Sequence, residues 1–134
     1  MVYLFQGEVV TNLYAYTTVA GAGQTSVWMA LFNSALSQVA ITADVKAVFA
    51  ATAGQMTCPL TTPYVIPADG AYYIALLGVG GTQPTVGRSN NTTGTTTDAI
   101  NGGLRPFGAQ AGQATMPGTA VVNQTTLQLF MRAG

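Results

Sequence analysis

The sequence contains no histidine and a single cysteine, Cys58. Without histidine, a Ser-His-Asp triad is excluded and the commonest metal ligand of proteins is missing. One cysteine can neither close an internal disulfide nor hold a zinc ion by itself. We therefore expect no metal, and we interpret Cys58 as a small hydrophobic residue in a strand rather than as a reactive thiol.

Charged residues are equally scarce, at 6% of the chain against roughly a quarter in an ordinary soluble domain. They are Glu8, Asp44, Asp69, Asp98, Lys46, Arg88, Arg105 and Arg132. A net charge of zero and scattered bases leave no basic patch for nucleic acid. Because so little charge protects the surface from association, we expect part of it to be buried against neighbouring subunits.

The acidic residues lie in separate segments, and none has a recognisable catalytic setting. A carboxylate pair for glycoside hydrolysis is the enzymatic alternative, but Asp69 fits a turn and Asp44 fits the first turn of a short helix. The glycine clusters at 21–23 and 78–81 lack the third glycine, or the Gly-Lys-Ser/Thr ending, of nucleotide-binding loops. We predict no catalytic residue and no cofactor.

Long hydrophobic runs are missing as well, because no apolar segment reaches the roughly 18 residues of a membrane-spanning helix. We therefore predict no membrane association. Residues 71–79, AYYIALLGV, form a shorter apolar run that follows a turn at Pro67-Ala68-Asp69-Gly70. Their aromatic and aliphatic composition between turn signals predicts a central strand that is buried on both faces.

Alternation of apolar and polar residues predicts further strands at 1–5, 9–19, 26–32, 36–42, 55–60 and 121–132. The glycine-rich loop at 21–24 favours a hairpin between the second and third of these. Residues 44–51 predict one short helix, with Thr42 as its cap. About eight short strands predict a single all-β domain over 1–134, an antiparallel β-sandwich of jelly-roll type.

A long Thr/Gly/Asn-rich loop is predicted at 80–103, and loops of this length are usually functional or disordered. Arg88 and Arg105 flank it, and Asn90 and Asn91 lie within it. We consider these four residues candidate contacts to a protein partner or to a glycan. A solvated loop end is the alternative for each arginine.

The aromatic residues offer a second candidate surface. Tyr14 and Tyr16, together with Trp28, Tyr64, Tyr72 and Tyr73, could form a platform on which a sugar ring stacks. The alternative is packing in the core and at subunit interfaces, where Tyr and Trp are also enriched. We favour packing for most of them and retain Tyr14 and Tyr16 as binding candidates.

Several motifs occur in a recognisable order: WMALFNS at 28–34, LTTPYVIP at 60–67, GAYYIALL at 70–77 and TQPT at 82–85. They resemble motifs of β-sandwich domains in virion structural proteins of tailed actinobacterial phages, which often form the outer domain of minor tail proteins. The resemblance covers roughly residues 11–88 and the part of the chain after Arg105. It implies a β-sandwich fold without catalytic residues.

From this resemblance and the charge-poor composition we expect a non-enzymatic protein of the virion surface. Its expected role is a capsid decoration or accessory module that binds major capsid or tail proteins, and itself as a homotrimer. The alternative is a minor tail or tail-fibre domain that binds host surface glycan through the 80–103 loop and the tyrosines. A glycan hydrolase is the third and least favoured reading.

Overall fold

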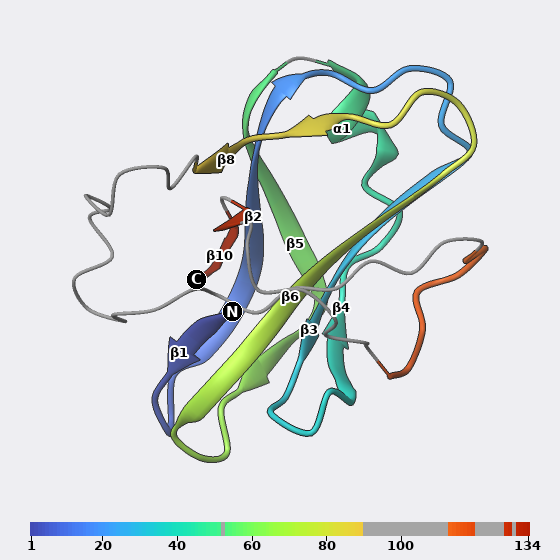
Figure 1. The fold of residues 1–134 in the computed structure, drawn as a ribbon. Coiled ribbons are helices and arrows are strands. Elements are labelled where there is room, and N and C mark those ends of the chain that lie inside the picture. Colours follow the sequence, from blue (N-terminus) through green and yellow to red (C-terminus); the bar gives the residue numbers. More distant parts are fainter. Residues whose placement is uncertain (52, 90–112, 120–127, 130) are drawn as a thin grey trace.

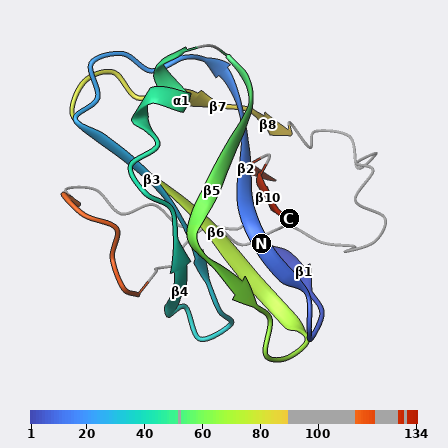
Figure 2. The same cartoon turned by 180° about the vertical axis from the view of Figure 1, so that it is seen from behind.

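The computed structural model describes residues 1–51, 53–89, 113–119, 128–129 and 131–134. Two antiparallel sheets and one short helix make up this part of the chain (Figures 1 and 2). The first sheet has the strand order β1-β6-β3-β4. Its strands are β1 (Val2–Leu4), β6 (Gly70–Val79), β3 (Ser26–Phe32) and β4 (Gln38–Ile41).

The second sheet has the order β10-β2-β5, and β7 also pairs with β2. Its strands are β10 (Met131–Ala133), β2 (Val9–Val19), β5 (Gly54–Val65) and β7 (Thr85–Val86). A further pair joins β8 (Arg88–Ser89) to β9 (Gln128–Leu129). The predicted all-β, antiparallel, sandwich-like fold is confirmed.

From β1 to β7, strands that follow one another in the chain lie in different sheets, except β3 and β4, which pair with each other. β2 pairs with β5 in one sheet, while β3 pairs with β6 and β4 in the other. In Greek-key sandwiches of the immunoglobulin type, strand B pairs with strand E, and strand C lies between strands C′ and F. Here β2 and β5 pair as B and E do, and β3 lies between β4 and β6 as C does. β1 pairs with β6 and β10 pairs with β2 on the remaining sides of these strands. The jelly-roll type stays a prediction. The predicted hairpin of 9–19 with 26–32 is wrong, because the connecting loop crosses from one sheet to the other.

The core lies between the sheets and follows from the two-residue period of the strands. Leu13 and Ala15 of β2 point inward opposite Cys58 and Met56 of β5, and all four are buried. The first sheet contributes, among others, Val27, Met29 and Leu31 of β3, which are completely buried. The predicted alternation is therefore confirmed at the centre of β2 and β5, but Val9 and Val19, which were expected on the same apolar face as Leu13, are more than half exposed.

The strand that is buried on both faces is β3, not β6 as predicted. Met29, Ala30, Leu31 and Phe32 are each 0% exposed, although successive residues point to opposite faces. Tyr72 is buried in β6, and the other residues of that strand are half-buried. β1 pairs with β6 at Gly70–Tyr72, so the rest of β6 has no partner on that side among the described strands.

A short helix, α1 (Lys46–Ala51), lies at the end of the sandwich where β3 begins (Figure 1). The predicted helix is confirmed, but its cap is Asp44 rather than Thr42. The Asp44 carboxylate accepts a hydrogen bond from the Lys46 N–H, whereas the Thr42 hydroxyl accepts one from the Met29 N–H. No helix among the described residues is long and apolar enough to cross a membrane.

The remaining predictions concern turns and the second half of the chain. The strand expected at 36–42 begins at Gln38, because the Asn33 carboxamide binds the N–H groups of Ala35 and Ser37 in a turn. The loop expected at 80–103 contains β7 and β8 at its start. Residues 90–103 and most of the strand expected at 121–132 lie outside the described residues.

Cys58 is buried in β5, and burial raises the pKa of its thiol from 9.0 to about 11. We therefore expect the native protein to react with a thiol reagent at pH 8 much more slowly than the urea-unfolded chain. Because the folded-state pKa is the higher one, stability should fall as the pH rises from about 9 towards 11. Native reaction at the unfolded rate would contradict this prediction, and Cys58→Ala should abolish the thiol's share of the pH dependence.

Candidate functional site

The three described carboxylates all serve the backbone. Glu8 Oε2 accepts a hydrogen bond from the Phe5 N–H at 2.7 Å, and Asp69 Oδ1 accepts one from the Gln6 N–H at 2.6 Å. Asp44 Oδ1 binds the N–H groups of Val27 at 2.9 Å and of Lys46 at 3.0 Å. These contacts explain the acidic residues as elements of loop structure. Asp98 lies outside the described residues.

Asp44 and Lys46 connect α1 to the start of β3. The Val27 N–H is the largest cause that lowers the pKa of the Asp44 carboxyl, and the Lys46 N–H and ammonium group lower it further. Lys46 Nζ lies 3.8 Å from Asp44 Oδ2 and donates a hydrogen bond to the Thr25 carbonyl at 3.0 Å. This pair therefore has a structural role at the helix end of the sandwich.

Tyr14 and Tyr16 occupy the outer face of the second sheet, because Leu13 and Ala15, which alternate with them, point into the core. Across the ladder, Tyr14 is opposite Thr57 and Tyr16 is opposite Gln55 on β5. Tyr16 is 49% exposed. The ring of Tyr14 lies over Gly134, where a Cβ atom would be 3.1 Å from its Cε2 atom. Two tyrosines with polar cross-strand neighbours therefore form a candidate binding face.

Strand pairing brings a third predicted residue to the edge of this face. The Gly87 N–H donates a hydrogen bond to the Tyr16 carbonyl at 2.7 Å, and Arg88 follows directly in β8. On the same side of β2, Arg132 of β10 pairs with Tyr14. Sequence reasoning missed Arg132, because its proximity depends on pairing across almost the whole chain. The predicted Asn90, Asn91 and Arg105 lie outside the described residues.

The six aromatic residues do not form a common platform, which was the less favoured alternative. Trp28 and Tyr73 lie on strands of the first sheet, whereas Tyr14 and Tyr16 lie on the second. Tyr72 is buried, and its hydroxyl donates a hydrogen bond to the Ala68 carbonyl at 3.3 Å. Tyr64 is half-buried against the core. Packing in the core therefore explains Tyr64 and Tyr72, as predicted from the sequence.

One end of the sandwich carries large apolar side chains in solvent. Tyr3 and Phe5 are 52% and 57% exposed, and Val9 and Val65 are 53% and 58% exposed. Reciprocal backbone bonds, from Gly7 to the Ile66 carbonyl and from Ile66 to the Glu8 carbonyl, hold the two loops of this end together. We call these four exposed residues the apolar tip. The alternation in residues 1–5 indicated an edge strand, but sequence reasoning missed the exposed cluster.

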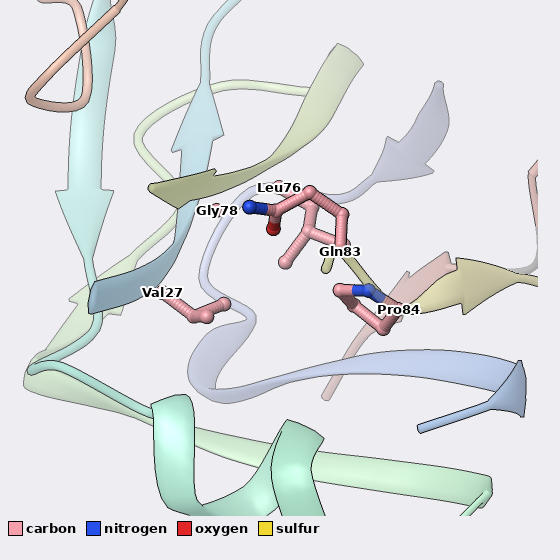
Figure 3. Close-up of a pocket in the computed structure, with 5 residues that line it drawn as sticks. All are labelled: Val27, Leu76, Gly78, Gln83 and Pro84. Carbon is pink, nitrogen blue, oxygen red and sulfur yellow. The ribbon is translucent and has the colours of Figure 1, made fainter. Parts of the chain in front are cut away.

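A small pocket of about 150 Å³ lies at the other end of β6, between the first sheet and the loop that follows β6 (Figure 3). Its lining residues are Val27, Leu76, Gly78, Gln83 and Pro84. Gly78 makes room for the Gln83 side chain, since a Cβ at position 78 would overlap the Gln83 carboxamide. Gln83 Nε2 donates a hydrogen bond to the Gly80 carbonyl at 2.6 Å, which holds the polar rim above an apolar floor.

Among the described residues, no group of three or more Asp, Glu or Cys side chains could hold a metal ion. The described part of the chain thus offers two exposed surfaces and one pocket as candidate sites. In comparisons with known proteins, no family model, no curated protein and no solved structure matches the chain.

Proposed function

We propose that this chain is a non-enzymatic structural protein of the surface of a tailed-phage virion. In this role it is a capsid decoration or accessory module that binds neighbouring virion subunits, with the homotrimer as its assembled form. The proposal combines the motif order of residues 28–85 with the surface chemistry of the fold. A domain of this kind works by fitting its surface to other proteins.

The apolar tip is the observation that carries the proposal. Two pairs of apolar residues lie at one end of the sandwich: Tyr3 contacts Phe5, Val9 is opposite Val65, and each of the four is more than half exposed. Such clusters are typical of protein interfaces, and the low charge of the chain removes the repulsion that would keep copies apart. The Glu8 and Asp69 carboxylates keep this end ordered through their bonds to Phe5 and Gln6. Little conformational entropy would then be lost on binding.

The copy number of the protein in purified virions tests the proposal. Quantitative mass spectrometry against the major capsid protein should give a ratio near one, or one trimer for each capsomer-scale site. A handful of copies per particle would favour the tail instead. Absence of the protein from purified particles would contradict a virion role.

A second candidate function is glycan binding at the tail, and the outer face of β2 favours it. Tyr14 and Tyr16 offer aromatic surface, and Gln55 and Thr57 offer hydrogen-bonding groups on the neighbouring strand. Aromatic faces with adjacent amide and hydroxyl groups suit the apolar and polar sides of a sugar ring. A glycan array should then show binding that Tyr16→Ala abolishes and Tyr3→Ala leaves unchanged.

A further inference from the structure

The apolar tip and the pocket lie at opposite ends of the same strand. β6 begins at Gly70, where β1 pairs with it, and reaches the pocket at Leu76 and Gly78. At about 3.3 Å per residue, the strand separates its two ends by roughly 30 Å. Figure 1 shows β1 at one end of the sandwich and α1 at the other. The tip of one copy therefore cannot fill its own pocket, but it can reach the pocket of another copy.

Phe5 has the form of a prearranged knob. Its ring is 57% exposed and packs edge-on against Tyr3, with 5.4 Å between the ring centroids. Its backbone N–H is held by the Glu8 carboxylate, and the Glu8 N–H donates a hydrogen bond to the Phe5 carbonyl. These contacts hold Phe5 in a position that leaves its ring in solvent. Exposure of an apolar ring to water is unfavourable, and a partner that covers the ring would remove this cost.

The pocket is large enough to receive an aromatic ring. Its volume of about 150 Å³ is similar to that of an engineered protein cavity that binds benzene, but this pocket is open to solvent on one side. Val27 and Leu76 form an apolar floor, and Pro84 and the Gln83 carboxamide form the rim (Figure 3). A phenylalanine side chain ends in a ring of benzene's size, so Phe5 fits the space.

We propose that Phe5 of one copy inserts into the pocket of a second copy, so that the chains associate head to tail. The inference rests on the proposed self-assembling role and names the contact that carries it out. A contact between two different patches is the type found in cyclic trimers. When the rotation that relates one copy to the next does not close a ring, the same contact gives an open chain of copies. One contact of this kind would therefore suffice for the proposed self-assembly.

Photo-crosslinking between copies tests the contact directly. Tyr3, which packs on Phe5, is replaced by a diazirine analogue of phenylalanine, and this variant is mixed with ¹⁵N-labelled wild-type protein. Mass spectrometry after irradiation should find cross-links from position 3 of the variant to residues 76–84 of labelled copies. Cross-links to another face, or no cross-link between copies, would overturn the proposal.

Sedimentation measurements supply the energetic test, with two matched aromatic variants. Phe5→Ala should weaken self-association at least about tenfold, as is typical for an aromatic side chain buried at the centre of an interface. Tyr16→Ala removes a similarly exposed aromatic from the other sheet and should leave association unchanged. Equal effects of the two variants, or a monomer at every concentration, would overturn the proposed contact.

The two proposals fail in distinguishable ways. If the protein is abundant in virions but Phe5→Ala assembles normally, the virion role stands and the head-to-tail contact is wrong. If the contact forms in solution but virions lack the protein, the contact stands and the virion role is wrong. Thermal unfolding of both variants verifies that each remains folded, as expected for substitutions of exposed side chains.

Discussion

Gly81→Ala is expected to destabilise the protein by about 3 kcal/mol or more, or to prevent folding. Gly81 has a φ of 56°, in the left-handed region that costs a residue with a Cβ atom roughly 1–2 kcal/mol. A Cβ at this position would also overlap the Ala22 carbonyl oxygen and the Gly23 carbonyl group. These are backbone atoms, so no side-chain rotation can relieve the overlap.

The close approach at Gly81 joins two loops that are distant in the sequence. Ala22 and Thr82 exchange backbone hydrogen bonds of 2.9 and 2.7 Å, which tie the β2–β3 connection to the end of β6. Displacing Gly81 would therefore break the contact between these two loops as well as strain one residue. The consequence should extend to the pocket, because Gly78 and Gln83 flank the same turn.

Urea unfolding followed by the fluorescence of Trp28, the single tryptophan, measures the effect. Gly7→Ala is the matched control, since Gly7 has a φ of 85° but nothing within 4 Å of the added Cβ. It carries the backbone strain without the overlap and should cost only about 1 kcal/mol. Equal losses for Gly7→Ala and Gly81→Ala would show that the loop contact contributes nothing.

Phe49→Ala is expected to cost about 3–5 kcal/mol of the free energy of unfolding. Phe49 is 0% exposed and is among the largest fully buried side chains. It belongs to α1, and a helix of six residues is not stable without tertiary packing. Loss of the ring would leave a cavity between the sheets and remove the main contact that holds α1. The Phe49 carbonyl, which accepts a hydrogen bond from the Gly21 N–H at 2.9 Å, would lose its position too.

The same fluorescence-detected unfolding experiment measures this loss. Phe49→Leu keeps most of the apolar volume and should cost less than about 1.5 kcal/mol, so the two variants separate cavity formation from a change of residue type. A loss below about 1 kcal/mol for Phe49→Ala would show that the helix end collapses around the deletion and that Phe49 is not a core anchor.

Local sequence patterns predicted most of the longer elements and, at the centre of β2 and β5, the side of the strand that faces the core. Leu13 and Ala15 point inward because strand residues alternate, and the same rule holds for Met56 and Cys58. The helix at 46–51 and the turn around Asp69 also follow from local signals. These features depend on residues a few positions apart, so periodicity and turn chemistry suffice.

Features that depend on distant residues were predicted less well. The expected hairpin of β2 with β3 does not form, because each strand gains its partners from later parts of the chain. The helix cap was assigned to Thr42 because sequence reasoning did not foresee that its hydroxyl binds Met29 on a neighbouring strand. Burial of β3 on both faces reflects its position between β6 and β4 in the sheet. Its apolar composition does not reveal this position, because β6 is equally apolar and is mostly half-buried.

The candidate sites divide in the same way. The sequence by itself determined the absence of histidine, the scarcity of charge, the alternating strands and the candidate residues Tyr14, Tyr16 and Arg88. Only the tertiary structure brings the backbone next to Arg88 to β2, through the hydrogen bond from the Gly87 N–H to the Tyr16 carbonyl. It also decided that Phe5 and the pocket lie at opposite ends of β6. The physical reason is that strand pairing closes long loops of chain, and the free energy that selects a partner comes from packing across the whole core.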